Sequence, residues 1–380
     1  SPPRCLCCAR AAAPLGRPAT ALAGPGSRSI ALYLDQILLE IRASPPGPPL
    51  ATVYIGGGTP SLLTPDQVRC LLDALADRFG LQQGAEITLE MDPASFSLAE
   101  LTALVRYGVN RVSLGGQSFD DVVLAALGRR HRRKDLLEAC RWMHHFLQEG
   151  RLRSWSLDLI RNLPDQSDAA WAAALTEAVA QHPPHLSIYD LSIEAGTVFA
   201  RREQQGTLML PDEAGAAARI AFTTKHLFDA GYCRYEISNF SRPGHASRHN
   251  RVYWSGAGWW AFGLGATSAP WGERFARPRT REAYALWLNQ QQRDGPHASL
   301  LQESALPLTL EDRLLVGLRR REGVDLLQQA QCCGWTVQRC SLHLPELERR
   351  WEEFLTQGLM VQRGRRWRLT DPLGMALSNQ

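Results

Sequence analysis

The sequence lacks several features that would assign it quickly to a common class. No apolar run approaches the roughly 20 residues that a membrane-spanning helix needs. No signal-like apolar segment stands at the start, where the first residue is Ser1. No G-x-G-x-x-G sequence opens the first strand–helix unit, which argues against a dinucleotide-binding fold.

A disulfide framework is also not indicated. The chain has nine cysteines, an odd number, and Cys70 and Cys140 lie inside apolar periodic stretches. Such cysteines fit the reducing cytoplasm better than a secreted, disulfide-bonded protein. We therefore expect a cytoplasmic location.

The composition that remains is that of an ordinary globular protein. Of 380 residues, 44% are hydrophobic and 21% are charged, which suits one large domain plus a smaller one. The formal net charge of +4 is mild and does not by itself indicate nucleic acid as a partner. We expect no nucleic acid among the partners.

Strand-like and helix-like segments alternate between residues 53 and 238, with short loops between them. This order is typical of a parallel sheet covered by helices, as a barrel or part of one. The expected strands are 53–55, 86–90, 111–114, 154–160, 186–189 and 235–238.

Glycine or polar residues stand where these strands end. They include Gly56 to Thr59, Glu90, Gln117, Asp158 and Asp190. In a parallel β/α barrel such ends meet at one mouth, where binding groups gather. A tight turn is the alternative for the glycines alone, and a structural network is the alternative for a single carboxylate. Three carboxylates and a glutamine together favour a shared ligand site.

Five segments, taken in order, resemble the radical SAM family: Gly56–Ser61, Glu90–Pro93, Val109–Phe119, Leu127–His131 and Asp158–Ile160. More narrowly, they are similar to the branch of oxygen-independent coproporphyrinogen dehydrogenases and HemW-type heme chaperones. The resemblance implies an α/β fold, a partial (β/α)6 TIM-like barrel, with a 4Fe-4S cluster and S-adenosylmethionine as cofactors.

The resemblance also implies a binding site for S-adenosylmethionine. Its residues would be Gly57, Gly58, Thr59, Glu90, Gln117, Arg129 and Asp158. The glycine turn would receive the methionine end, and the glutamate and glutamine would lie near the ribose. The arginine would pair with the ligand carboxylate, because guanidinium offers a planar fork for it. The aspartate would help to close the site.

A His-Asn-x-x-Tyr-Trp segment at 249–254, followed by the glycine-rich stretch 262–266, is similar to the heme-chaperone branch rather than to the dehydrogenases. Imidazole is a common axial ligand of heme iron, which makes His249 a candidate heme ligand. An aromatic loop over the barrel mouth is the alternative.

The function implied by the resemblance is heme binding and delivery to an acceptor protein, membrane-bound or respiratory. Two alternatives stay open: oxidative decarboxylation of coproporphyrinogen, and a cluster-defective paralogue. Whether the protein is an enzyme is therefore undecided at this point.

The family's cluster motif is C-x-x-x-C-x-x-C, whose three thiolates hold the iron. Cys5 and Cys8 match its second and third positions, and Ser1 stands at the first. A serine hydroxyl is a much poorer ligand of iron–sulfur clusters than a thiolate. The resemblance therefore implies either a truncated or rearranged copy, or an impaired cluster.

Four regions are expected: a degraded cluster loop at 1–26, the radical SAM barrel at 27–270, a linker helix region at 271–300, and a HemN-type C-terminal domain at 301–380. Helices at 310–321 and 346–356 and a hairpin across 363–366 predict a small winged-helix-like domain. Gly116 and Asn162 stand where the family more often has an apolar residue and a glycine.

Overall fold

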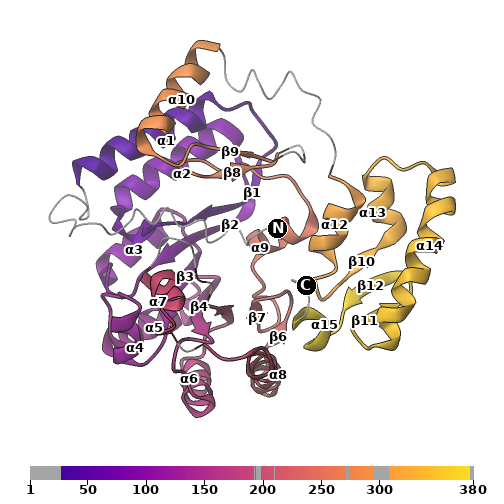
Figure 1. Ribbon diagram of the computed structural model, residues 1–380. Helices are drawn as coiled ribbons and strands as arrows, with labels where there is room; N and C mark the ends of the chain where they lie inside the picture. The colour runs from indigo at the N-terminus through magenta and orange to yellow at the C-terminus, as the bar shows by residue number, and fades with distance from the viewer. Residues whose placement is uncertain are drawn as a thin grey trace.

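The structure is a computed structural model that describes residues 27–376, apart from 192, 194–197, 209, 271, 273 and 295–307. Cys5 and Cys8, the expected cluster ligands, lie outside the described residues. The described chain has two hydrophobic cores, one in a large α/β domain and one in a smaller C-terminal domain (Figure 1).

Seven strands of the described chain form the sheet of the large domain, in the order β1-β2-β3-β4-β5-β7-β6. The first five pair in parallel and in chain order, whereas β7 and β6 pair antiparallel. The strands are β1 (Leu50–Ile55), β2 (Leu81–Met91), β3 (Arg111–Gln117), β4 (Ser154–Arg161), β5 (His185–Asp190), β6 (Cys233–Arg234) and β7 (Asn239–Ser241). Successive parallel strands of this kind build part of a β/α barrel, so the predicted fold class is confirmed.

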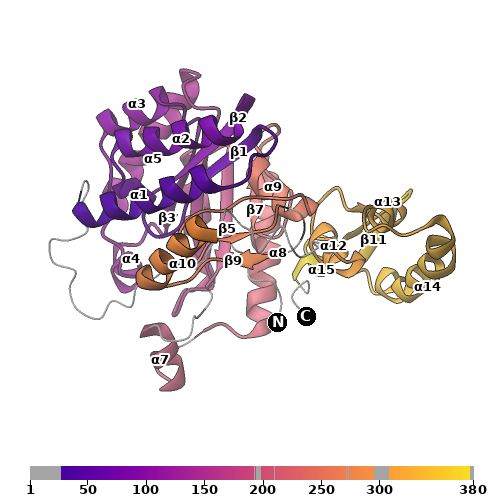
Figure 2. The same cartoon turned by 90° about the horizontal axis from the view of Figure 1, so that it is seen from above.

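Helices connect the parallel strands and cover one face of the sheet, as α1, α2, α3 and α5 show in Figure 2. The helices before β6 are α1 (Arg28–Ala43), α2 (Pro65–Phe79), α3 (Leu98–Arg106), α4 (Asp121–Ala126), α5 (Arg133–Gln148), α6 (Asp168–Ala180), α7 (Val198–Gln204) and α8 (Glu213–Asp229). Of these, α1 precedes β1, α2 to α6 lie between successive parallel strands, and α7 and α8 follow β5. Thr64 caps α2 as the sequence predicts, in a capping box with Gln67. Among the residues described, no helix combines the length and apolar composition that crossing a bilayer requires.

The parallel strands alternate between apolar and polar side chains. One face packs under the helices and includes Val53, Ile87, Leu89, Val112, Leu114, Trp155, Leu157, Leu186 and Ile188. The other face carries Thr52, Tyr54, Glu86, Thr88, Glu90, Arg111, Ser113, Ser156, Asp158, His185 and Ser187. Parallel strands covered by helices on both faces are usually apolar throughout. Here the inner face is polar, and this polar face holds the candidate site.

The strand expected at 235–238 is wrong. These residues form the turn between β6 and β7, a short antiparallel hairpin. Side chains fold this turn: the Arg234 guanidinium donates to the Ile237 carbonyl, and the Glu236 carboxylate accepts from the Asn239 amide. These side-chain hydrogen bonds hold the turn in place of strand pairing.

The segment after the hairpin returns across the barrel to α1. It contains α9 (Arg248–Ser255), β8 (Thr267–Ser268), β9 (Phe275–Ala276) and α10 (Arg281–Asp294). β8 pairs with β9, so one hairpin joins residues on both sides of the domain boundary predicted at 270. The boundary itself stays a prediction.

A buried polar network attaches this segment to α1. The Glu40 carboxylate accepts from Arg277 Nε at 2.7 Å, from the Tyr284 hydroxyl at 2.5 Å and from the Gly263 N–H at 2.9 Å. Glu40 and Arg277 are each only 2% exposed. Three donors from three parts of the segment therefore converge on one carboxylate.

The C-terminal domain consists of four helices and a three-stranded sheet among the described residues. Its elements are α12 (Leu310–Gly317), β10 (Val324–Asp325), α13 (Leu326–Cys332), α14 (Val337–Thr356), β11 (Met360–Arg363), β12 (Arg366–Leu369) and α15 (Leu373–Ala376). The predicted hairpin is present as β11 and β12. The helix expected at 346–356 begins nine residues earlier, at Val337, because Thr336 caps it and Pro345 is accommodated within it.

Prediction: breaking the Glu40 network destabilises the large domain strongly. Arg277→Met leaves a buried carboxylate without its cation, which should lower the free energy of unfolding by about 3–5 kcal/mol. The matched control is Lys225→Met, which breaks the exposed pair with Asp229 and should cost less than about 1 kcal/mol. Urea unfolding followed by circular dichroism measures both. Equal losses in the two variants would contradict the role given to Glu40.

Candidate functional site

The glycine turn after β1 is exposed and is tied to the end of β2. Glu90 accepts hydrogen bonds from the Gly57 N–H and from the Tyr54 hydroxyl, both at 2.8 Å. A Cβ on Gly56 would lie 2.5 Å from the Tyr54 ring and 2.8 Å from Glu90, so only glycine fits there. Gly57 and Gly58 have φ of 84° and 66°, which favour glycine through backbone conformation.

Two more predicted residues lie close to Gly115 near the end of β3: Gln117, the last residue of the strand, and Arg129, from the loop after α4. Gln117 has a φ of 63°, an uncommon value for a residue with a side chain, and the β3–β4 register shifts just before it. A Cβ on Gly115 would lie 3.1 Å from the Gln117 amide and 3.2 Å from the Arg129 guanidinium. Gly115 therefore leaves room for both side chains over the strand end.

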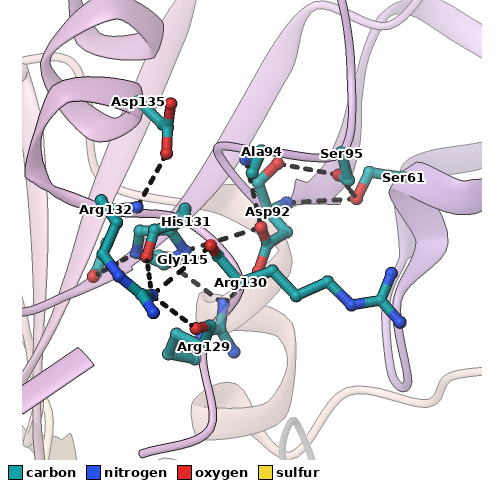
Figure 3. A network of polar contacts seen from close by, with 11 residues as sticks. Ser61, Asp92, Ala94, Ser95, Gly115, Arg129, Arg130, His131, Arg132 and Asp135 are labelled. Atoms are coloured by element: carbon teal, nitrogen blue, oxygen red, sulfur yellow. Dashed lines mark hydrogen bonds and ion pairs between the residues drawn. The ribbon is translucent and has the colours of Figure 1, made fainter. Parts of the chain in front are cut away.

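Asp92 is the centre of a polar network that the sequence analysis did not identify (Figure 3). Its carboxylate lies 2.7 Å from Arg129 Nη2 and 3.5 Å from His131 Nδ1. Its backbone N–H donates to the Ser61 hydroxyl. Burial tends to raise the pKa of Asp92, but the contact with His131 and the charge of Arg129 outweigh it and lower the pKa. Asp92 is therefore a carboxylate held in its charged form.

Arg129 has an internal partner that the sequence analysis does not predict. Arg129 was expected to pair with a ligand carboxylate, and in the structure it pairs with Asp92 and donates to the Gly115 carbonyl. The sequence contains a signal for this pairing, since Asp92 stands two residues after Glu90, just beyond the end of β2.

Asp158 lies deeper than expected. It was predicted at a strand end, but β4 continues to Arg161, so Asp158 lies within the strand on the polar inner face. It accepts hydrogen bonds from Ser113 and Ser156, both at 2.8 Å. Burial raises the pKa of Asp158, although these serine hydrogen bonds oppose the rise. Asp158 is thus part of the barrel interior rather than of the exposed edge.

A chain of hydrogen bonds extends from Asp158 across the inner face. Ser156 contacts His185 Nδ1 at 2.8 Å, and His185 Nε2 contacts the Tyr235 hydroxyl at 2.8 Å. Burial lowers the pKa of His185 well below its usual value, so the ring is neutral. The alternation of polar and apolar residues within the strands was the signal for this interior network, which the sequence analysis did not use.

His249 lies against β1 with both ring nitrogens engaged. Nδ1 is 2.9 Å from Thr52 Oγ1, and Nε2 is 3.2 Å from the Tyr253 hydroxyl. Burial, assisted by the positive charge of Arg111, lowers the pKa of His249 to about 4. The imidazole is therefore neutral near pH 7, which is the form that ligates metals.

Glu86 fixes the position of His249 by binding the start of α9. Its carboxylate accepts from the Ser247 hydroxyl at 3.2 Å and from the backbone N–H groups of Arg248 and His249 at 3.0 and 2.9 Å. The first N–H groups of a helix have no partner inside the helix, and a carboxylate satisfies them favourably. Glu86 is a positioning residue that the sequence analysis missed.

Aromatic rings continue from His249 in a row. Tyr54 stacks on His249 with centroids 4.9 Å apart, Tyr253 meets His249 edge-on at 5.2 Å, and Trp259 meets Tyr253 at 4.9 Å. We call these four rings the aromatic row. Tyr54 also donates to Glu90, which accepts from Gly57, so Glu90 links the aromatic row to the glycine turn.

The two departures from the family pattern have structural reasons. A Cβ on Gly116 would lie 2.8 Å from Leu157 and 3.1 Å from Leu136, so those leucines occupy the space that a larger residue would need. Asn162 has a φ of 59°, in the left-handed region that glycine or asparagine adopts most readily. Its amide donates to Asp190. Neither departure disturbs the strand ends.

The structure therefore brings together part of the predicted set. Gly57, Gly58, Thr59 and Glu90 lie at the ends of β1 and β2, and Gln117 lies at the end of β3. Arg129 reaches the end of β3 from the loop after α4, where it donates to the Gly115 carbonyl. Asp158 and His249 lie inside the barrel. No group of three metal-binding side chains suited to a metal ion occurs among the described residues.

Comparison with known proteins agrees with this architecture. The family model "Radical SAM superfamily" matches residues 2–175. The solved structure of coproporphyrinogen III oxidase (HemN) from Escherichia coli superposes with a TM-score of 0.70 at 22% identity, covering 92% of this chain and 82% of that chain. At this identity the likeness shows the fold alone.

Curated relatives are closer in sequence. Heme chaperone HemW of Synechocystis sp. is 38% identical, over 92% of this chain and 86% of the relative. Heme chaperone HemW of Lactococcus lactis is 31% identical, over 72% of this chain and 70% of the relative. The mitochondrial radical S-adenosyl methionine domain-containing protein 1 of Mus musculus is 35% identical, over 82% and 70%. This chain belongs to the radical SAM superfamily, in the family of the heme chaperone HemW.

Proposed function

We propose that this protein is a heme chaperone, which binds heme and delivers it to an acceptor protein. Family membership supports the proposal, and the aromatic row is the observation that carries it. A porphyrin is a flat, largely apolar ring, and aromatic side chains offer it matching walls. A neutral imidazole lies within that row, where an axial ligand is needed.

His249 is the proposed axial ligand. Its two hydrogen-bond contacts determine which ring nitrogen can bind the heme iron. When Nδ1–H donates to Thr52, the lone pair of Nε2 is directed at the Tyr253 hydroxyl. Iron coordination through Nε2 must replace that 3.2 Å contact, which is longer than most hydroxyl–nitrogen hydrogen bonds. Thr52 then keeps the tautomer that ligation needs.

We also propose that S-adenosylmethionine binds at the ends of β1, β2 and β3. The fit rests on the exposed glycine turn, on the Glu90 carboxylate that pins it, and on Gln117 and Arg129 at the adjacent strand end. When bound to a 4Fe-4S cluster that an external donor has reduced by one electron, S-adenosylmethionine would be cleaved to methionine and a 5′-deoxyadenosyl radical. Cys5 and Cys8 are the proposed cluster ligands, with the hydroxyl of Ser1 at the remaining position of the motif.

The acceptor protein is proposed only as a class. A membrane-bound or respiratory hemoprotein fits the function, and nothing in the contacts described here selects one. We further propose a cytoplasmic location, because the six described cysteines are free thiols, the state that a reducing compartment maintains.

Prediction: the full chain binds hemin saturably, and His249 contributes an axial ligand. Titration with hemin, followed at the Soret band, should show saturation in the wild type and loss of the histidine-ligated spectrum in His249→Gln. His145→Gln is the matched control, since His145 is exposed and lies on α5. Absence of saturable hemin binding in the wild type would refute the proposed function.

Prediction: substitution of Arg129 weakens the binding of S-adenosylmethionine, whereas substitution of Asp92 does not. If Arg129 binds the ligand carboxylate, Arg129→Ala should weaken binding by about 1.5–3 kcal/mol, the worth of a charge-assisted hydrogen bond. Asp92→Asn removes the competing internal carboxylate and should leave binding unchanged or stronger. Calorimetry with S-adenosylmethionine measures both. An equal loss in both variants would show that Arg129 only supports the fold of the site through Asp92.

Prediction: His249 makes the fold sensitive to acid. Its pKa is about 4 in the folded chain against 6.5 when unperturbed, so the unfolded chain binds the proton first as pH falls. The free energy of unfolding should therefore decrease between pH 6.5 and 4, on account of this group.

Chemical denaturation at a series of pH values tests this sign. His249→Gln should flatten the decrease relative to the wild type, while the exposed His145→Gln should not. Asp158 and Glu236 have raised pKa values and act in the opposite direction, so the comparison of variants isolates His249. Parallel curves for wild type and His249→Gln would contradict the prediction.

A further inference from the structure

A depression of about 430 Å³ lies between the β6–β7 hairpin and the C-terminal domain, and charged side chains line part of it. Arg242 contributes from the turn after β7, and Arg321 and Glu322 contribute from the segment between α12 and β10. Figure 1 shows β6 and β7 on the side of the barrel that faces α15. The Arg321 N–H donates to the Tyr235 carbonyl at 3.0 Å, so the contact between the two domains brings both arginines to one depression.

The outer face of the C-terminal sheet continues this positive charge. Arg363 of β11 lies opposite Arg366 of β12, and Val361 lies opposite Arg368. Residues directly opposite each other in an antiparallel pair lie on the same face of the sheet, so the three arginines share one face. Met360 and Trp367 lie on the other face, in the core of the domain.

The arginines of the depression and of the sheet lie near enough to affect one another. Burial lowers the pKa of Arg320 and of Arg368, and in both cases the charges of neighbouring arginines add to the effect. These neighbours are Arg251 and Arg366 for the first, and Arg321 and Arg363 for the second. The positive charge therefore extends without a break from α9 across the depression to the sheet.

Few carboxylates balance this charge. Neither Arg242 nor Arg321 has a carboxylate within ion-pair distance in the described part of the chain, and the same holds for the three arginines of the sheet. Arg251 and Arg320 share one carboxylate, that of Glu322. We call these seven residues the basic surface: Arg242, Arg251, Arg320, Arg321, Arg363, Arg366 and Arg368. Because like charges held together are relieved by a ligand of opposite sign, the basic surface favours an anionic partner.

The acids that do occur here narrow the class of partner. Glu322 lies in the depression, and Asp325 lies opposite Arg366 in the sheet. A continuous phosphate backbone would meet both carboxylates, whereas a peptide can place its own carboxylates between them. Clusters of arginine are a recurring recognition site for acidic peptide segments, since guanidinium binds carboxylate through paired hydrogen bonds. The pattern therefore favours an acidic protein segment over nucleic acid.

We propose that the basic surface is the docking site for an acidic segment of the heme acceptor protein. The identity of the partner rests on the proposed heme-chaperone function. The position of the surface supports it, because Arg251 lies on α9 between His249 and Tyr253, two members of the aromatic row. An acceptor docked here lies beside the helix that carries the proposed heme ligand.

The test follows the fluorescence anisotropy of a labelled oligoglutamate peptide as the full chain is added. The wild type should bind the peptide saturably, and more weakly as ionic strength rises, because salt screens exposed charges. Arg321→Glu/Arg366→Glu should weaken binding by about tenfold or more, since each substitution replaces an attraction with a repulsion. Arg321→Lys/Arg366→Lys keeps the charge and should retain most of the binding.

The matched control is Arg106→Glu/Arg141→Glu, which changes the net charge equally at exposed arginines on α3 and α5. It should leave the affinity for the peptide near that of the wild type. Equal affinities in the two glutamate variants overturn the proposal, because binding would then follow net charge alone. An oligothymidylate of the same charge should bind more weakly than the peptide, and tighter binding overturns the proposal in favour of nucleic acid.

Hemin titration of the same variants separates this inference from the proposed function. Arg321→Glu/Arg366→Glu should bind hemin as the wild type does, because neither arginine belongs to the aromatic row. A wild type that binds hemin but no peptide overturns the docking site and leaves the chaperone function intact. A wild type that binds the peptide but no hemin refutes the proposed function, and with it the heme acceptor as partner, whereas the site for acidic peptides stands.

Discussion

The contact between Glu86 and the start of α9 is the interaction on which the inner side of the barrel depends. One carboxylate on β2 receives three donors from Ser247, Arg248 and His249. Because these donors are the unpaired end of a helix, the contact is favourable both as hydrogen bonds and through the helix dipole. It brings a segment more than 150 residues away in the chain against β1 and β2 and sets the place of the imidazole.

Hydrogen bonds between buried polar groups also extend across the inner face of the sheet. Buried polar groups are usually hydrogen-bonded, and on this face Ser113, Ser156, Asp158 and His185 bond to one another. Thr88 Oγ1 and two nitrogens of the Arg111 guanidinium have no hydrogen-bond partner in the described chain. The pKa values of two aspartates near this face are shifted in opposite directions. Arg129 and His131 hold Asp92 in its charged form against the effect of burial, whereas burial prevails at Asp158 and raises its pKa. A ligand at the exposed edge therefore meets a charged carboxylate at Asp92, whereas in the interior the charge of Asp158 is disfavoured.

Tyr54 joins the two halves of the candidate site. Its hydroxyl donates to Glu90 at the glycine turn, and its ring stacks on His249. A ligand at the glycine turn and a ring system along the aromatic row would therefore contact opposite ends of one side chain.

The sequence by itself determined the order of strands and helices, because hydrophobic spacing is local. It also determined the capped start of α2 and the residues at the ends of β1 to β3, because capping residues and glycines act on the backbone next to them. It failed at 235–238, where β-favouring residues form a turn held by the side chains of Arg234 and Glu236. Only the tertiary structure decided that Arg129 pairs with Asp92, that Asp158 lies inside the barrel, and that Glu86 holds α9. These contacts join residues far apart in the chain, and local sequence carries no information on which distant partner each charged group meets.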